Sequence, residues 1–163
     1  LENTYIKSNF IAQVYIHGDS LQSELVAIVV PDPEVAVPWG IAHHILPTST
    51  PPATAPQPGQ PPHPALLTLV QSDKFRKAVQ EDMNRLAKAD KLRGFEVVKK
   101  IGFEVEPWSV ANGLLTPSFK LKRVEAAEKY RSVIDGLYKE LAADKAVSAP
   151  LDSTGPAVLK PKL

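Results

Sequence analysis

The sequence predicts a small α+β domain with a sheet of about three strands, including a hairpin, flanked by helices. Three observations support this fold class. Residues 10–17 alternate as a strand does, residues 25–30 form a continuous apolar run, and residues 72–92 and 124–142 repeat apolar side chains at helical spacing. The expected order of elements is β-β-α-α-β-loop-α. A length of 163 residues suits one such domain with tails.

The first two strands are expected to form a hairpin near the N-terminus. Residues 10–17 have the alternation of a half-buried strand, and a turn signal follows at 17–20. Residues 25–30 are apolar and rich in β-branched side chains, which is typical of a strand covered on both faces. One side of the first strand carries Phe10, Ala12, Val14 and Ile16, and the other side carries Ile11, Gln13, Tyr15 and His17.

Two long helices are predicted in the second half of the chain. The first spans residues 72–92, with Ser72 or Asp73 as its N-terminal cap and Gly94 as its end signal. The second spans about residues 124–142, where apolar residues again recur at helical spacing. Both helices therefore have an apolar face that can pack against a sheet.

A third strand and a short helix complete the expected domain. Residues 95–105 alternate again, although Lys99 interrupts the apolar side. Residues 34–46 form a weak helix candidate. The apolar residues of the third strand, which share one parity, are Phe95, Val97, Ile101, Phe103 and Val105.

The chain divides into four stretches. Residues 1–46 hold the N-terminal strands and the short helix, and residues 65–143 hold the remaining helix, strand, lysine-bearing loop and C-terminal helix of the same domain. Between them, residues 47–64 contain too many prolines for a helix or a strand ladder, so we expect a disordered insertion with polyproline II character. This insertion is either a tolerated loop expansion or a docking element for an SH3-type or WW-type partner. Residues 144–163 are expected to be a flexible tail.

The composition argues against several classes of function. Nineteen Lys and Arg against 18 Asp and Glu give a net charge of +1, whereas a general nucleic-acid binder needs a basic excess. The absence of cysteine excludes disulfides and thiolate chemistry, and the four scattered histidines give no reason to expect a metal site. No apolar run approaches the roughly 18 residues that span a bilayer. The opening at Leu1, without a methionine, predicts a segment cut from a longer protein.

The most informative run is residues 112–123, just before the second long helix. Asn112 and Gly113 favour a tight turn, Pro117 fixes its own φ, and Phe119 is expected to be an apolar anchor for the loop. Three cations follow at a helix N-terminus, which is the unfavourable end for positive charge. They serve an external anion or are simply solvated. The hydroxyl-bearing residues are Thr116 and Ser118, and the cations are Lys120, Lys122 and Arg123.

This run resembles the last signature motif of the long-chain fatty acyl-CoA synthetases, which are members of the adenylate-forming enzyme superfamily. The long-chain branch carries a similar string, Leu-Leu-Thr-Pro-Thr-Phe-Lys-Leu-Lys-Arg. Two departures are Ser118 in place of the commoner threonine and Val124 where proline is usual. The resemblance covers most of the chain expected to be ordered. Further segments that look like the family are residues 2–8, 10–20, 25–33 and 91–96.

The resemblance implies the mobile C-terminal domain of an ATP-dependent, AMP-forming long-chain fatty acid–CoA ligase. It implies that Lys120 is the catalytic lysine, which enters the active site for acyl-adenylate formation. After the domain rotates, His17, Gly18 and Asp19 are candidates for the face that closes the coenzyme A channel. The residues expected to support the lysine are Gly113, Leu115, Thr116, Pro117, Ser118, Lys122 and Arg123.

The resemblance also implies cofactors and partners. ATP and Mg²⁺ would be bound mainly by an N-terminal adenylation domain that this sequence does not contain, and coenzyme A would be the co-substrate of a long-chain fatty acid. The isolated chain is expected to be inactive. Association with a membrane surface is a possible further interaction, and nucleic acid is not an expected partner. The alternatives are a non-catalytic, stand-alone fragment or interaction module that docks through the Pro-rich insertion, and an adenylate-forming ligase for a different acid.

The last four residues, Lys160-Pro161-Lys162-Leu163, resemble a peroxisomal address of the Ser-Lys-Leu type. Pro161 stands in place of the usual small residue. The expected location is the peroxisome, and the alternatives are the cytoplasmic face of the endoplasmic reticulum and the cytosol.

Overall fold

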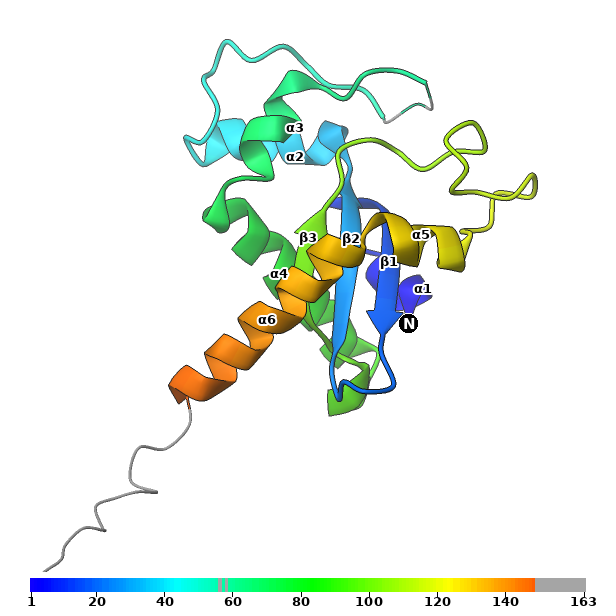
Figure 1. Cartoon of the computed structure of the whole chain (residues 1–163). Coiled ribbons are helices and arrows are strands. Elements are labelled where there is room, and N and C mark those ends of the chain that lie inside the picture. The colour runs from blue at the N-terminus through cyan, green and yellow to red at the C-terminus, as the bar shows by residue number, and fades with distance from the viewer. Residues whose placement is uncertain (56, 58, 149–163) are drawn as a thin grey trace, which may run out of the picture.

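The structure, a computed structural model, describes residues 1–55, 57 and 59–148 and confirms the α+β fold class (Figure 1). Within these residues, a mixed sheet of three strands packs between two groups of helices. In chain order the elements are α1 (Glu2–Tyr5), β1 (Ile11–Gly18), β2 (Leu25–Pro31), α2 (Pro33–Ala42), α3 (Pro64–Leu69), α4 (Asp73–Ala89), the 3₁₀ helix η1 (Gly94–Glu96), β3 (Val98–Phe103), α5 (Arg123–Lys129) and α6 (Arg131–Ser148).

The strand β2 lies at the centre of the sheet. The strand order is β1-β2-β3, with β1 antiparallel and β3 parallel to β2. The β1–β2 pairing runs from Ile11 opposite Pro31 to Gly18 opposite Leu25, so the expected hairpin is confirmed. Residues 26–30 are each at most 1% exposed, which explains why the central strand is a continuous apolar run.

Helices cover both faces of the sheet. In Figure 1, α5 and α6 cross one face of the sheet, while α4 lies behind it. Successive side chains of β2 point to opposite faces, so Ala27 and Val29 enter a first core and Val26, Ile28 and Val30 enter a second core. The first core also contains Tyr5, Val37, Leu66, Leu69, Phe75, Val79 and Met83, and the second core contains Trp108, Leu114, Tyr130, Ile134 and Leu137.

The alternation expected along β1 is wrong at the beginning of the strand. The register shifts between Ile11 and Gln13, which places an extra residue in β1. Ile11 therefore shares the first core with Val14, whereas Ala12 packs against the second core. A shift of one residue moves every following side chain to the other face, and a count of alternating residues does not reveal it.

The first long helix begins as predicted but ends earlier. Ser72 caps α4 by accepting a hydrogen bond from a backbone N–H in the first turn at 3.3 Å. The helix ends at Ala89 rather than at residue 92, because Lys91 adopts a left-handed backbone with φ 58°. Gly94, the expected end signal, instead begins η1.

The third strand is shorter than predicted because η1 occupies residues 94–96. Phe95 was expected on the apolar side of the strand, but its side chain is 62% exposed. A register shift against β2 leaves Lys99 as an extra, exposed residue of β3. Val98 and Ile101 can therefore both face the first core.

The second long helix is in fact two helices joined at Tyr130. α5 ends directly before this residue and α6 begins directly after it, and the joint has φ −99° and ψ 12°. The apolar spacing continues across the joint, so periodicity gave no sign of it. α6 extends to Ser148, so the expected tail from residue 144 starts as helix. Residues 149–163, with the C-terminal address, lie outside the described residues.

The sequence pattern did not indicate the short helices α1 and α3. α3 begins at Pro64, the last residue of the expected insertion, and His63 Nδ1 accepts a hydrogen bond from the N–H of Ala65 at 3.2 Å. The described residues between 47 and 63 form no helix or strand, yet Ala53 packs against the first core. Disorder of this segment stays a prediction. The weak helix expected at 34–46 is present as the shorter α2.

Gly102→Ala is expected to lower the free energy of unfolding by about 1–3 kcal/mol through overpacking. A Cβ at Gly102 would lie 2.8 Å from Val133 Cγ1 and 3.3 Å from Ile28 Cδ1. Val133 is β-branched and cannot easily rotate away. The matched control is Gly136→Ala on α6, where nothing lies within 4 Å of the new Cβ. This control should raise stability by about 0.5–1 kcal/mol. Denaturant unfolding measures both changes, and equal effects would contradict the close approach of β3 to α6.

Candidate functional site: the lysine loop

The lysine loop, residues 104–122, connects β3 to α5. Because β3 runs parallel to β2, the loop leaves the sheet at the end where β2 also ends, opposite the turn between β1 and β2. Figure 1 shows the loop in yellow-green, extending away from the sheet and separate from that turn. The two regions that the sequence predicted to be functional therefore leave the sheet at different ends.

Trp108 holds the first part of the loop in the second core. Its side chain is 3% exposed, and its Nε1 donates to the hydroxyl of Tyr130 at 2.7 Å. That hydroxyl donates in turn to Glu104 Oε2 at 2.8 Å. Burial raises the pKa of Tyr130, so the hydroxyl stays protonated and remains a donor. These hydrogen bonds join the loop, the end of β3 and the joint between α5 and α6.

The backbone of Trp108 is also paired with β1 through the side chain of Gln13. The amide of Gln13 donates to the carbonyl of Trp108 at 3.1 Å and accepts from its N–H at 2.8 Å. The side-chain amide thus makes the pair of hydrogen bonds that a neighbouring strand would make. Sequence reasoning missed these residues because 95 positions separate Gln13 from Trp108 and 22 separate Trp108 from Tyr130.

Asn112 and Gly113 form the tight turn that the sequence predicts. Gly113 has φ 80°, a conformation that glycine adopts without a steric cost. Asn112 Oδ1 accepts from the N–H groups of Ser109 at 2.9 Å and Leu114 at 3.3 Å, and its Nδ2 donates to the carbonyl of Pro107 at 2.9 Å. The turn is therefore fixed by its own side chain before the loop reaches the lysine.

The tip of the loop is a small hairpin, residues 115–121. Leu115 pairs antiparallel with Leu121. The N–H of Thr116 donates to the carbonyl of Lys120 at 2.8 Å, and Thr116 Oγ1 accepts from the N–H of Lys120 at 3.1 Å. Three residues, 117–119, connect Thr116 to Lys120. In a common form of this connection, a glycine in the left-handed region occupies the third position.

Phe119 occupies this third position, with φ 65°. A left-handed backbone costs a residue with a Cβ roughly 1–2 kcal/mol. The side chain is 75% exposed, so the expectation that Phe119 anchors the loop is wrong. Trp108 and Leu114, each 3% exposed, hold the loop instead. Pro117 stands at the first position of the connection, where its fixed φ suits the turn.

Lys120 is exposed, and among the described residues its ammonium has no ion-pair or hydrogen-bond partner. Its backbone, in contrast, is bonded through both N–H and carbonyl to Thr116, whose hydroxyl also lies 3.1 Å from Ser118 Oγ. A free ammonium on a held backbone can be presented to an anion outside the domain. Lys122 is partly exposed and precedes α5 without a side-chain capping hydrogen bond.

Arg123, the third cation of the motif, is engaged within the domain. Its guanidinium donates to Glu2 Oε1 at 2.8 Å and to the carbonyl of Ile16 at 2.7 Å. Its central carbon also lies 5.1 Å from the centre of the Tyr15 ring. Arg123 thus ties the start of α5 to α1 and β1, and its contribution to the loop is structural support.

The turn residues predicted for the coenzyme A channel border a separate hollow of about 380 Å³. Gly18 does not line this hollow, and a Cβ at this position would lie 2.8 Å from Leu25 Cδ2. His17 Nδ1 lies 2.9 Å from the hydroxyl of Tyr15, which holds the imidazole in place. The residues that line the hollow are His17, Asp19, Ala127, Arg131, Ile134 and Asp135.

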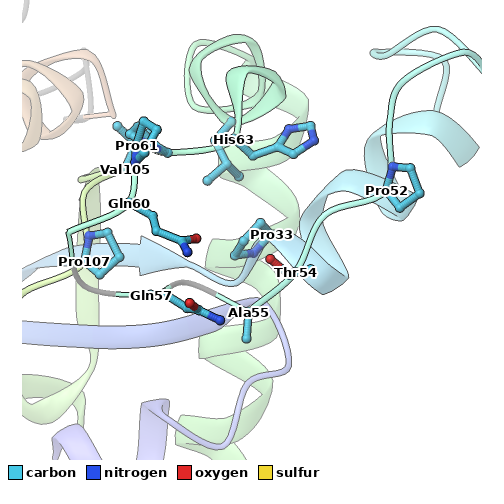
Figure 2. A pocket seen from close by; sticks show the side chains of 12 residues that line it. Pro33, Pro52, Thr54, Ala55, Gln57, Gln60, Pro61, His63, Val105 and Pro107 are labelled. Carbon is cyan, nitrogen blue, oxygen red and sulfur yellow. The ribbon is translucent and has the colours of Figure 1, made fainter.

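A smaller pocket, of about 140 Å³, lies between the Pro-rich segment and the start of the lysine loop (Figure 2). Val105 and Pro107 contribute one part of its wall, and residues between 52 and 63 contribute most of the rest. Within the described ranges, no three His, Cys, Asp or Glu side chains are grouped so that they could hold a metal ion.

Tyr130→Phe is expected to destabilise the chain by about 1–3 kcal/mol, because the buried Nε1 of Trp108 loses its acceptor. The matched control is Tyr138→Phe. This hydroxyl donates to the carbonyl of Glu24 at 2.9 Å in a partly exposed position, where water can replace it, so the loss should be smaller. Urea unfolding followed by tryptophan fluorescence measures both. Equal losses of unfolding free energy in the two variants would contradict the larger cost expected at the buried hydroxyl of Tyr130.

The stability of the chain is expected to fall as the pH falls through about 6.5, the ordinary pKa of histidine. Burial lowers the pKa of His17, Arg123 acts in the same direction, and Asp19 and Asp135 oppose it. The unfolded chain therefore binds more protons than the folded chain at mildly acidic pH. His17→Gln should flatten the dependence of unfolding free energy on pH between about 7.5 and 5.5. An unchanged slope in His17→Gln would contradict the assignment.

Comparisons with known proteins find related sequences and solved structures with a similar fold. No family model matches the chain. The chain is 36% identical over 151 residues to the peroxisomal long chain acyl-CoA synthetase 7 of Arabidopsis thaliana. The aligned region covers 93% of the chain and 19% of that protein. It is 41% identical over 138 residues to human long-chain-fatty-acid–CoA ligase 6, and this alignment covers 85% of the chain and 17% of that protein.

Among solved structures, the adenylation domain of a carboxylate reductase from Mycobacterium chelonae is similar to the chain with a TM-score of 0.63 and 25% identity. The similarity covers 85% of the chain and 17% of that structure. The chain thus spans only a small share of each of these proteins. The chain is therefore a homologue of one segment of the long-chain acyl-CoA synthetases, 17–19% of their length, and it has a fold found in adenylate-forming enzymes.

Proposed function

We propose that this chain is the C-terminal domain of an ATP-dependent, AMP-forming long-chain fatty acid–CoA ligase. The observation that carries the proposal is its identity of 36–41% with two long-chain acyl-CoA ligases over 85–93% of the chain. Its role would be to supply Lys120 for acyl-adenylate formation and then to help close the site for thioester formation. The rest of the polypeptide would provide the adenylation domain.

In the first step, a carboxylate oxygen of the fatty acid forms a bond to the α-phosphorus of ATP while the bond to pyrophosphate breaks. Two anions are brought together, and negative charge builds up on the α-phosphate oxygens. The ammonium of Lys120 would contact both groups, offset that charge and keep them in line. The unpartnered ammonium on the tip hairpin supports this role, because nothing in the described residues has to release it first.

Mg²⁺ would supply charge neutralisation at the leaving pyrophosphate when it is bound. The described residues of this chain gather no set of metal ligands, and we infer that the adenylation domain holds Mg²⁺ and most of the ATP. In this arrangement the small domain contributes a single, mobile positive charge. Lysine suits that task because its ammonium is a compact point charge on a flexible stem.

In the second step, the thiol of coenzyme A attacks the acyl carbonyl, and AMP leaves. We infer that the domain rotates between the steps, because its two candidate sites lie at opposite ends of the sheet. The hollow beside His17 and Asp19 borders the β1–β2 turn, while the lysine loop leaves the opposite end of the sheet. A rotation that withdraws Lys120 can therefore bring this hollow toward the active site.

We propose a peroxisomal location, which is supported by the name of the Arabidopsis relative. The cytoplasmic face of the endoplasmic reticulum and the cytosol are the alternatives. Within the described part of the chain, no helix is both long and apolar enough to traverse a bilayer. The rival function, a stand-alone interaction module that docks through residues 47–64, rests on composition alone.

Lys120→Ala, in the complete polypeptide that carries this chain, is expected to slow acyl-adenylate formation by about 10²–10³-fold, because one electrostatic contact to the transition state is lost. Thioester formation from supplied acyl-adenylate should stay within a small factor of the unaltered rate. Fatty-acid-dependent exchange of pyrophosphate into ATP measures the first half-reaction, and release of AMP measures the second.

The control for this experiment is Lys99→Ala, which removes another exposed lysine, on β3 and outside the loop. It should leave both half-reactions unchanged. Equal losses in the two half-reactions after Lys120→Ala would refute the role proposed for this lysine.

A further inference from the structure

Phe119 is not explained by the stability of this domain. It occupies the third position of the connection in the tip hairpin, where glycine is the low-strain choice, and it has φ 65°. A bulky side chain in this region is an outlier that calls for an explanation. Burial does not provide one, since 75% of Phe119 is exposed. Within this domain, the ring therefore gains little in return for a strained backbone.

The surroundings of Phe119 limit what it can contact. The next residue is Lys120, and the hairpin bonds between Thr116 and Lys120 hold the backbone on both sides of the ring. If the ammonium of Lys120 enters a site on another domain, the tip must touch the surface around that site. A neighbouring aromatic ring on a held backbone will then be desolvated together with the lysine.

We propose that Phe119 is a docking residue, which seats its ring in an apolar recess of the adenylation domain when Lys120 enters the active site. The inference rests on the function proposed above and adds a second contact to it. The ring would supply apolar burial that is realised only in the adenylate-forming arrangement, and the lysine would supply the charge. Phe119 is in this sense a positioning residue, because it acts on the reaction through the placement of Lys120.

A protein recess fits the observations better than a lipid surface. Stable attachment to a membrane takes a broad apolar face or several anchoring elements. The tip offers one ring between Ser118 and Lys120, with the hydroxyls of Thr116 and Ser118 3.1 Å apart. A single rigid aromatic side chain beside a charged group is typical of an anchor that fills a pocket at a protein interface.

The test compares Phe119→Gly with Phe119→Leu in the complete polypeptide. Glycine keeps the left-handed backbone and removes the ring, so Lys120 should remain mounted as before. Phe119→Gly should slow acyl-adenylate formation about 10- to 100-fold, which corresponds to the loss of one buried aromatic side chain. Phe119→Leu keeps apolar bulk and should retain most of the rate. Thioester formation from supplied acyl-adenylate should be unchanged in both.

A stability measurement separates docking from folding. In thermal unfolding of this chain, Phe119→Gly should leave the midpoint unchanged or raise it, because strain is relieved and almost no buried surface is lost. A lower rate of adenylate formation together with undiminished stability supports docking. A full rate in Phe119→Gly, or an equal loss in both half-reactions, would overturn it.

Two controls assign a failure to its source. Lys120→Ala is measured in parallel, and if it leaves adenylate formation intact, the function proposed for the domain fails, whatever Phe119 does. If Lys120→Ala acts as expected and Phe119→Gly does not, only the docking inference fails. Sedimentation with phosphatidylcholine–phosphatidylserine vesicles tests the lipid alternative. Loss of vesicle binding in Phe119→Gly with an unchanged exchange rate would overturn the protein recess in favour of a membrane contact.

Discussion

The arrangement of this domain depends on one strand that has no solvent-facing side. Residues 26–30 of β2 are each at most 1% exposed, so both faces of the sheet must be covered by helices. The chain between β2 and β3 supplies α2, α3 and α4 for the first core, because a parallel pair needs a long crossover connection. The helices after β3, α5 and α6, cover the second core. The lysine loop carries the chain from β3 to these helices on the other face of the sheet, which is why it begins at β3 and ends at α5.

The loop keeps a defined shape because buried polar groups are paired as it leaves the sheet. The hydroxyl of Tyr130 accepts from Trp108 and donates to Glu104, while Gln13 bonds both backbone groups of Trp108. Among the described residues, no buried side-chain nitrogen or oxygen lacks a hydrogen-bond partner. A complete network of this kind specifies a single arrangement, since any alternative would leave a buried group unpaired. The loop therefore has a defined conformation although it contains no helix and no regular strand.

Much of this fold and part of the site could be predicted from the sequence. The apolar run of β2 and the helical spacing of α4 are unambiguous because burial at these elements is nearly complete. Pattern reasoning failed at Ala12, Phe95 and Tyr130, where a bulge, a 3₁₀ turn and a helix joint each change the backbone at one point and leave the spacing of apolar residues intact. The motif predicted the turn at Asn112 and Gly113, which the structure confirms, whereas the catalytic role of Lys120 stays a proposal. The prediction that Phe119 anchors the loop was wrong, because it assumed that an apolar loop residue is buried, whereas Phe119 is exposed.

Both ends of the lysine loop rest on the same strand. Trp108, near the start, is bonded to Gln13, and Arg123, just after the end, is bonded to the carbonyl of Ile16, so that β1 carries both attachments. The backbone at Lys120 cannot swing out like a free loop unless these bonds break. Only the stem of the side chain retains fast motion, on the picosecond-to-nanosecond scale of exposed rotamers. Larger displacements of the ammonium would follow the collective motion of a whole domain, on the scale of microseconds to milliseconds. Under the proposed function, the arrival of the charge and the turning of the domain would then be a single kinetic event.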